Sequence, residues 1–156
     1  DGVLTDGHLL LDDNGSWLRK MNIKDGYALQ QAVKKGYNVV VVSGSASDPA
    51  YLRLHKLGIL DVRFDIQNKS SALLNIIDQY KLSHSNILYM GDDIPDLIAR
   101  NYCGLFCCPA DASQDVLDHA DWISPKCGGN GAVRDVIEKV LRAQDKWDMF
   151  GNISSI

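Results

Sequence analysis

The sequence lacks the cysteine patterns of metal-binding and disulfide-linked proteins. Its four cysteines, Cys103, Cys107, Cys108 and Cys127, form no Cys-x-x-Cys pair, and its four histidines stand at no matching ligand spacing. A zinc site is therefore not expected. Cys107 and Cys108 adjoin each other in an apolar run, which predicts small core residues. This cysteine usage fits a reducing cytoplasm better than an oxidising compartment.

Long apolar runs and an excess of positive charge are also missing. No run approaches the roughly 18 apolar residues of a membrane span, and no secretory signal peptide is visible. The net charge is −4, so the broad basic face that binds nucleic acid is not expected. A small phosphorylated substrate stays compatible, because it needs only a local lysine and a metal ion.

Internal repeats and low-complexity linkers are absent as well. The length of 156 residues and the hydrophobic content of 46% predict a single domain over 1–156 with a sizeable core. The segment Gly128-Gly-Asn-Gly131 matches neither a P-loop nor a dinucleotide fingerprint. A helix-entry turn is the favoured interpretation of it, with a phosphate cradle as the alternative.

Strands alternate with helices along most of the chain. Asn14-Gly15 predicts a β-hairpin over 8–21, with strands at Leu9–Asp12 and Ser16–Met21. Further strands are predicted at 39–42, 62–65, 87–90, 105–108 and 122–124. Helices are predicted from Asp25 to Gly36, from an Asp48 cap to Gly58, after a cap at Ser70 or Ser71, and over 95–102, 112–119 and 132–144. This alternation predicts an α/β fold, a Rossmann-like parallel sheet flanked by helices, with the hairpin projecting from it.

Acidic residues gather where the apolar strand at Ile87–Met90 ends. Asp92, Asp93 and Asp96 follow it within a few positions. One interpretation is that Asp93 or Asp96 only caps the next helix. The other is an oxygen-rich Mg²⁺ site, because clustered carboxylates repel one another unless a cation or proton relieves them.

Other polar residues are predicted at the same edge of the sheet. Ligands of parallel α/β folds bind beyond the carboxyl ends of the strands. Ser43-Gly44 follows the strand at 39–42, Lys69 precedes a helix on the same rim, and Asp1 belongs there if a strand precedes it. Carboxylates for Mg²⁺, donors for phosphate oxygens and a lysine are the parts that phosphoryl transfer needs. A nucleophile, for which Asp is suitable, and a second acid would complete the site.

These segments resemble a known family. Asp1-Gly-Val-Leu-Thr-Asp6, Ser43-Gly44, Lys69 and Gly91–Asp96 are similar to the four motifs of the haloacid dehalogenase superfamily, in order and at fitting spacings. The capless branch of 3-deoxy-D-manno-octulosonate 8-phosphate (KDO 8-phosphate) phosphatases gives the closest resemblance. Three further segments carry it: Lys24-Asp25-Gly26, 55–59 and Gly128–Arg134.

The resemblance implies a role for each site residue. Asp1 would be the general acid/base and would lend its backbone carbonyl to the metal, while its partner nucleophile would lie two positions earlier, on a first strand that precedes Asp1. Ser43 and Gly44 would bind the phosphoryl group and Lys69 would steady it. Asp92 would ligate Mg²⁺ directly, with Asp93 and Asp96 close behind it. The substrate contacts would also include Asp25 and Arg134.

The resemblance also implies an activity. It is the Mg²⁺-dependent hydrolysis of KDO 8-phosphate to KDO and phosphate, through an aspartyl-phosphate, in the cytoplasm and for lipopolysaccharide synthesis. Ser45 stands where the branch usually has arginine, and Asn68 where it prefers aspartate. A nine-carbon keto-sugar acid phosphate is therefore an alternative substrate. A non-catalytic oligomerisation module of a sugar-activating system is the alternative from another class.

The hairpin predicts an assembly of several copies. Its apolar residues Leu9, Leu11, Trp17 and Met21 fit a buried interface better than a free arm. The resemblance implies a homotetramer in which the hairpins pair around a central axis and neighbours cover the open site. The tail at 145–156, which carries Trp147, Met149 and Phe150, is expected to reach a neighbouring site.

Overall fold

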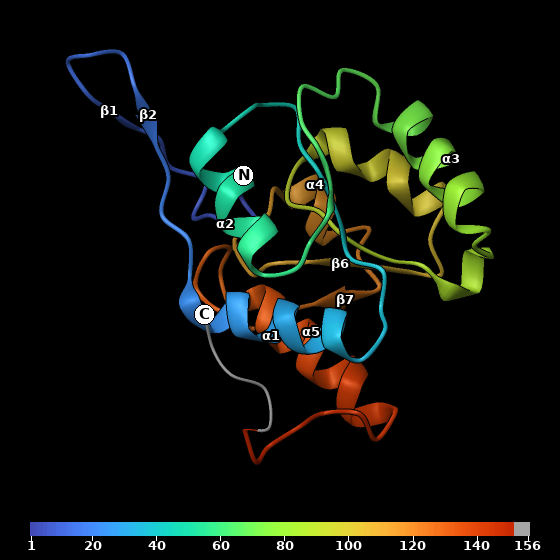
Figure 1. Ribbon diagram of the computed structural model, residues 1–156. Helices are drawn as coiled ribbons and strands as arrows, with labels where there is room; N and C mark the ends of the chain where they lie inside the picture. Colours follow the sequence, from blue (N-terminus) through green and yellow to red (C-terminus); the bar gives the residue numbers. More distant parts are fainter. Residues whose placement is uncertain (152–156) are drawn as a thin grey trace.

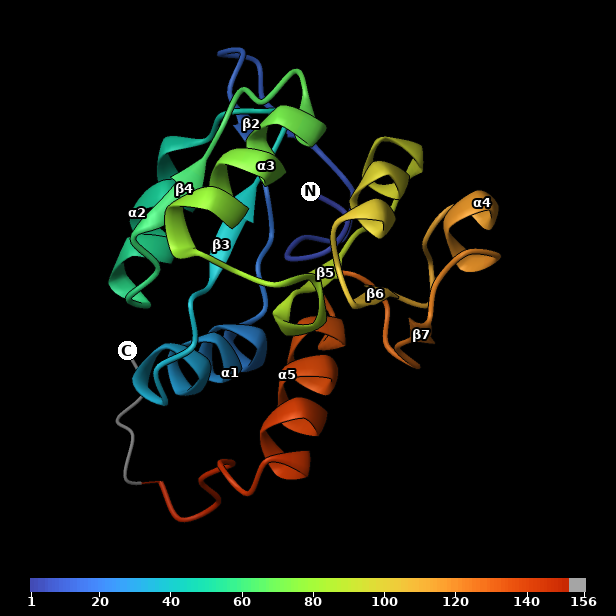
Figure 2. The same ribbon diagram turned by 90° about the vertical axis from the view of Figure 1, so that its right-hand side faces the viewer.

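The structure is a computed structural model, and it describes residues 1–151. Five strands in two sheets are parallel throughout (Figures 1 and 2). In the first sheet β3 (Val40–Val42) pairs with β4 (Asp61–Arg63). In the second β5 (Leu88–Met90) pairs with β6 (Leu105–Cys108), which pairs with β7 (Trp122–Ile123). The predicted parallel α/β architecture is confirmed, but the strands form two sheets where one was expected.

Helices surround the two sheets. They are α1 (Ile23–Lys34), α2 (Asp48–Lys56), α3 (Lys69–Tyr80), α4 (Gln114–Leu117) and α5 (Ala132–Ala143), with 3₁₀ helices η1 (His84–Asn86) and η2 (Ile94–Asn101). Helices α1 and α5 lie side by side on one face of the sheets, and α3 packs against η2 on the other (Figure 2). The element predicted at 95–102 is thus a 3₁₀ helix, and the one predicted at 112–119 is only four residues long.

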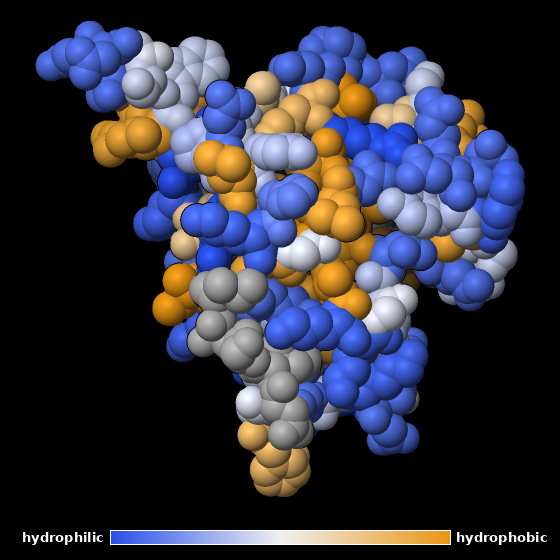
Figure 3. Space-filling view, viewed as in Figure 1, coloured by the Kyte–Doolittle hydropathy of each residue, from blue (hydrophilic) through white to orange (hydrophobic). Residues whose placement is uncertain are grey.

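A cavity of about 1320 Å³ separates the two sheets. The edges of β3 and β5 face it, and apolar side chains of α1 and α5 line its floor, among them Leu29, Val136 and Leu141. Apolar surface also shows in the middle of the face seen in Figure 3. Val40, Val41 and Val42 are half-buried for this reason, although a fully buried strand was predicted.

Two apolar clusters lie on either side of this cavity. One gathers around the buried Phe106 and Val116, beneath β6 and η2. The other gathers around Leu54, Leu57 and Ile59, between α2 and α1. Cys107 and Cys108 are fully buried and all four cysteines are free, so the expectation of small core residues holds.

The predicted hairpin projects from the body (Figure 1). Strands β1 (Leu10–Leu11) and β2 (Trp17–Leu18) are antiparallel and shorter than expected. The carboxylate of Asp12 accepts hydrogen bonds from the backbone N–H groups of Asn14 and Ser16, at 3.0 and 2.7 Å, and so shapes the turn. Met21, which was predicted to be exposed on the hairpin, is partly buried. Its backbone bridges to Thr5, and its side chain packs against the core of the body.

Two helix caps differ from those expected. Ser47, and not Asp48, caps α2 by accepting from the backbone N–H of Ala50. Asn68 caps α3 by accepting from the N–H of Ser71 at 3.0 Å, so that Lys69 is the first residue of the helix. In both cases a residue one to three positions earlier has the extended backbone that an N-cap requires.

The start of the tail folds back on α1 and α5. Trp147 lies against the guanidinium groups of Arg134 and Arg142, at 5.1 and 5.7 Å. The side-chain amide of Gln31 both donates to and accepts from the backbone of Asp148 at 3.0 Å. Met149 and Phe150 beyond it are exposed, and the rest of the predicted tail, 152–156, lies outside the described residues.

Residues 1–151 contain no helix long and apolar enough to cross a membrane.

Candidate active site

One end of the cavity between β3 and β5 is polar. Its lining there includes Asp1, Ser43, Gly44, Lys69, Asp92, Asp93 and Asp96. These residues come from four separate segments: the N-terminal loop, the end of β3, the start of α3 and the loop after β5. The fold therefore brings together most of the residues that the sequence pattern selected.

The buried carboxylate of Asp96 organises this end of the cavity. One of its oxygens accepts from Lys69 Nζ and from the hydroxyl of Tyr89, each at 2.5 Å. The other accepts from the backbone N–H of Asp92 at 3.2 Å. Since both oxygens are occupied in this way, Asp96 is placed to hold Lys69 and the Asp92 loop rather than to bind a cation directly.

Tyr89 is a site residue that sequence reasoning missed. Burial, together with the nearby charge of Asp96, raises the pKa of Tyr89 above its usual value. The hydroxyl therefore stays protonated and acts as a donor. Its position within an apolar strand signals a core residue, and only the contact with Asp96 reveals another role.

Asp92 has the environment of a cation ligand. Burial first, then the charges of Asp96 and Asp93, raise the pKa of Asp92 to about 6, against the opposing charges of the Asp1 amino group and of Lys69. No hydrogen-bond donor of residues 1–151 reaches its carboxylate. A bound cation would supply the missing positive partner.

Gly2 leaves room for that carboxylate. Its φ is +71°, and a Cβ atom there would lie 1.8 Å from Oδ2 of Asp92. Only glycine combines this left-handed backbone with so close an approach. The loop that carries Asp1 therefore packs directly against Asp92.

Both interpretations of the acidic cluster apply, but to different residues. Asp93 is the N-cap of η2 and accepts from the backbone N–H of Ile94 at 2.8 Å, in a capping box with Asp96. Asp92 takes no part in the cap. Sequence spacing could not separate these two neighbouring acids.

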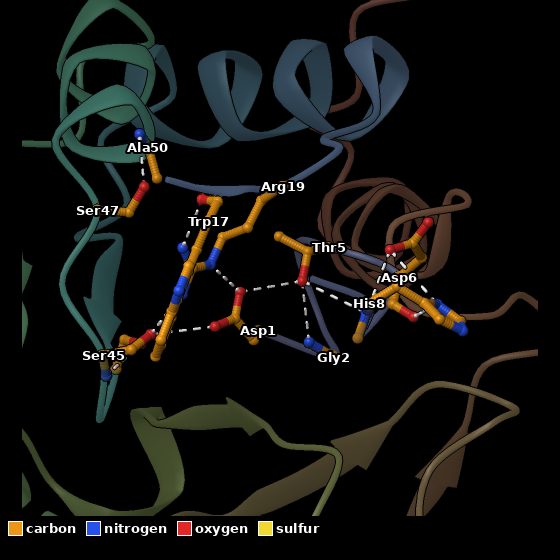
Figure 4. Close-up of polar contacts among 12 residues, drawn as sticks. Asp1, Gly2, Thr5, Asp6, His8, Trp17, Arg19, Ser45, Ser47 and Ala50 are labelled. Carbon is orange, nitrogen blue, oxygen red and sulfur yellow. Dashed lines mark hydrogen bonds and ion pairs between the residues drawn. The ribbon is translucent and has the colours of Figure 1, made fainter. Parts of the chain in front are cut away.

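Asp1 stands in a closed set of hydrogen bonds (Figure 4). Oδ1 accepts from Arg19 Nε at 2.7 Å and from the Thr5 hydroxyl at 3.2 Å, and Oδ2 accepts from the Ser45 hydroxyl at 3.0 Å. Nη2 of Arg19 in turn donates to Ser45 Oγ at 3.1 Å. Arg19 was not selected from the sequence, because an arginine just beyond a hairpin strand looks like a solvated charge.

Ser43 and Gly44 form the turn after β3. The backbone N–H of Ser43 donates to the carbonyl of Arg63, and its own carbonyl accepts from Ile66, at 2.9 and 3.0 Å. These bonds tie the turn to the neighbouring strand segment. The hydroxyl of Ser43 faces Ser45 at 3.5 Å and lines the cavity mouth.

Asp25 and Arg134 do not line this cavity. The fully buried carboxylate of Asp25 accepts from the backbone N–H groups of Gly131 and Arg134, at 3.1 and 2.7 Å, and so caps α5 from a distant part of the chain. The side chain of Arg134 pairs with Glu138 and covers Trp147. The geometry gives both residues structural contacts, and their predicted substrate contacts stay a prediction. His8 is exposed and pairs with Asp6, away from Asp1.

The residues present suit a hydrated magnesium ion. In residues 1–151 no three side chains of Asp, Glu, His or Cys gather as a ready ligand set. Mg²⁺ is usually held by one or two carboxylates, with waters and substrate phosphate completing its octahedron. Asp92, which lacks a donor and has a raised pKa, provides one such carboxylate beside the Asp1–Gly2 backbone.

Comparisons with known proteins identify the family of this chain. Residues 54–137 match the family of haloacid dehalogenase-like hydrolases. The chain is 32% identical to the 3-deoxy-D-manno-octulosonate 8-phosphate phosphatase of Salmonella typhi over 148 residues, 95% of this chain and 79% of the relative. It is 33% identical to the phosphatase of the same name from Haemophilus influenzae over 150 residues, 96% of this chain and 83% of the relative.

Solved structures show the same likeness. The 3-deoxy-D-manno-octulosonate 8-phosphate phosphatase of Moraxella catarrhalis, in complex with magnesium, phosphate and KDO, superposes with a TM-score of 0.91 at 31% identity, over 96% of this chain and 86% of that one. A hypothetical protein from Xanthomonas campestris superposes with a TM-score of 0.89 at 37% identity, over 94% and 80%.

The parallel α/β fold, the site and the family match place the chain among the haloacid dehalogenase-like hydrolases. Within them it belongs to the family of 3-deoxy-D-manno-octulosonate 8-phosphate phosphatases.

Proposed function

We propose that this protein is a Mg²⁺-dependent phosphatase that hydrolyses 3-deoxy-D-manno-octulosonate 8-phosphate to KDO and phosphate, for lipopolysaccharide synthesis. The observation that carries the proposal is the meeting of Asp1, Ser43, Lys69 and Asp92 at one mouth of the cavity. The relatives named above, and the magnesium, phosphate and KDO in one of them, support the substrate class.

Each residue has a task that its contacts support. Mg²⁺, held by Asp92 with Asp93 and Asp96 behind it, would supply charge neutralisation for the phosphoryl group. Ser43 and the backbone at Gly44 donate to phosphate oxygens, and Lys69, held by Asp96, adds positive charge beside them. Asp1 delivers a proton to the leaving alkoxide and later takes one from water.

The attacking carboxylate is proposed to come from a strand that precedes Asp1. The cavity supports this, because it has the unpaired edges of β3 and β5 on two sides and apolar side chains below. A parallel strand in this place would join the two sheets and end at the polar mouth. An aspartate two positions before Asp1 would then form the aspartyl-phosphate. Sequencing the intact N-terminus of the natural protein tests this.

The identity of the sugar acid needs its own test, because Ser45 stands where the branch usually has arginine. The phosphate of a nine-carbon keto-sugar acid is therefore the second candidate. Phosphate release with Mg²⁺ over a panel of sugar-acid phosphates decides between them. We expect the eight-carbon substrate to be preferred, and equal rates on every small phosphomonoester would defeat the proposal.

A non-catalytic oligomerisation module is the alternative from another class. The ordered contacts of Asp1, Lys69 and Asp96 argue against it, since an inactive site has no need to hold them. Complete absence of Mg²⁺-dependent phosphate release from the natural full-length protein would favour the module.

We also propose that the protein assembles as a homotetramer in the cytoplasm. Leu9, Leu10, Leu11, Trp17 and Leu18 are exposed on the hairpin, and such a projecting apolar surface supports an interface between copies. The exposed Met149 and Phe150 support a contact of the tail with a neighbour. The four free cysteines support a reducing compartment.

A further inference from the structure

We propose that Arg19, at the root of the hairpin, is the positioning residue of the general acid/base Asp1. This inference rests on the proposed phosphatase function and extends it to a residue outside the four motifs. The observation behind it is the closed ring of hydrogen bonds that joins Arg19, Asp1 and Ser45.

Donors and acceptors in this ring have one consistent assignment. Arginine can only donate, so Ser45 Oγ accepts from Nη2 of Arg19. The single hydroxyl proton of Ser45 is then directed to Oδ2 of Asp1, while Nε of Arg19 and the hydroxyl of Thr5 both bind Oδ1. Asp1 is thus bound on both oxygens, which fixes the plane of its carboxylate. A general acid must have such a fixed direction toward the leaving oxygen.

Arg19 itself is held rigidly enough for this task. Its side chain is only 7% exposed, whereas that of the adjacent Lys20 is 72% exposed. Strand β2 ends directly before it, and the bridge between Thr5 and Met21 follows two residues after it. A buried guanidinium with fixed neighbours loses little freedom when it binds its partners.

Ser45 makes the contact possible. Its hydroxyl accepts from the guanidinium of Arg19 at 3.1 Å and donates to Asp1 at 3.0 Å. The site therefore receives its positive charge beside Asp1 from the hairpin, and not from the turn after β3. The hairpin is in this way connected to the catalytic acid by a direct contact.

Lys20 provides a matched control. It lies next to Arg19 on the same strand end and carries the same charge, but it pairs with Asp6 at 2.7 Å. Replacing either residue by methionine removes one positive charge from the hairpin root. Only Arg19→Met removes a contact with Asp1.

The decisive measurement compares two leaving groups in the natural full-length protein. Alkyl alkoxides of sugar phosphates need a proton as they leave, whereas p-nitrophenolate does not. We expect Arg19→Met to lower kcat/KM on the sugar-acid phosphate by on the order of 10²-fold, with kcat/KM on p-nitrophenyl phosphate within about threefold, because kcat/KM reports the steps up to departure of the leaving group and leaves out the later hydrolysis that both substrates share. Arg19→Lys should restore part of the loss, because an ammonium group reaches one acceptor of the two. Lys20→Met should change neither rate.

The ring predicts a second result. Ser45→Ala and Arg19→Met should not add in the double variant, because each breaks the same ring. Equal losses of kcat/KM on both phosphates, or a loss in Lys20→Met as large as in Arg19→Met, would overturn the positioning role and leave Arg19 as a fold contact. Wild-type protein that hydrolyses neither phosphate would overturn the proposed function as well.

Discussion

At the scale of single residues, the site depends on how three neighbouring acids are used differently. Asp93 caps η2, Asp96 holds Lys69 and the loop, and Asp92 alone faces the cavity without a donor. Their side chains are the same and their positions differ by four at most. The difference arises from which backbone N–H groups and cations each carboxylate meets in the folded chain.

Replacement of Asp92 tests the metal assignment. In Asp92→Asn the neutral amide can no longer neutralise Mg²⁺, so the Mg²⁺-dependent rate should fall by at least about 10²-fold. Phosphate release measured against Mg²⁺ concentration checks this. Asp13→Asn, in the exposed hairpin turn, is the control and should leave the rate unchanged. An unchanged rate in Asp92→Asn would remove Asp92 from the site.

Gly2 offers a test of the close packing at the same place. Gly2→Ala would put a Cβ atom 1.8 Å from Oδ2 of Asp92 and force an alanine to φ +71°. The Asp92 carboxylate has to move, so we expect weaker Mg²⁺ binding by calorimetry as well as slower turnover. Gly15→Ala, also at positive φ but with no atom within 4 Å, isolates the backbone effect. Equal behaviour of the two variants would contradict the packing argument.

At the scale of elements, a residue of one helix caps another helix that is distant in the sequence. Helix α5 begins at Gly131, which has no side chain to cap it, and the buried Asp25 of α1 supplies the missing acceptor. The sequence signal at Asp25 was a motif match and suggested substrate binding. The structure shows why an aspartate belongs there independently of any substrate.

The buried cap makes a prediction about pH. Burial raises the pKa of Asp25, against the opposing hydrogen bonds from Arg134 and Gly131. The folded state therefore holds this proton more tightly than the unfolded state, where the pKa is about 3.9. The stability that Asp25 contributes is largest below that value and declines as the pH rises through the higher pKa of the folded state.

Asp25→Asn separates this effect from other titrations. An asparagine oxygen can accept from only one of the two N–H groups, so the variant should lose about 1–3 kcal/mol of unfolding free energy. Because asparagine does not titrate, the difference from wild type should shrink from pH 4 to pH 7. Urea unfolding at several pH values measures it, and a difference that grows with pH would refute the sign.

At the scale of the whole molecule, two surfaces stand out among the described residues 1–151 because no other described segment covers them. One is the cavity between β3 and β5, and the other is the apolar hairpin. Arg19 directly follows strand β2 of the hairpin and donates to Asp1. An interface formed by the hairpin would therefore lie close to Asp1. The proposed assembly and the candidate active site would therefore share a structural element.

A change of charge on the hairpin tests the assembly. Trp17→Asp together with Leu11→Asp should dissociate the proposed tetramer, because charges are costly inside an apolar interface. Light scattering at micromolar concentration reports the mass. Leu60→Asp, which alters an exposed leucine on the body, is the control and should stay assembled. A monomeric mass for the wild type would refute the interface.

Much of the fold was predictable from local patterns. The alternation of β-branched runs with amphipathic segments placed every parallel strand within about two residues, and Asn14-Gly15 placed the hairpin. Cap positions were less predictable, because several nearby polar residues can cap a helix and backbone conformation selects among them. The wrong assignments at Asp48, Ser70 and Ser71 all have this origin.

The sequence by itself determined the order of the motifs, the parallel α/β class and the chemistry that Asp1, Ser43, Lys69 and Asp92 can perform, because these depend on residue type and spacing along the chain. Only the tertiary structure decided that Arg19 and Tyr89 join the site, that Asp25 caps α5 and that Arg134 covers Trp147. Such contacts join residues up to 109 positions apart. They follow from how packed elements orient their side chains, and no local pattern contains that information.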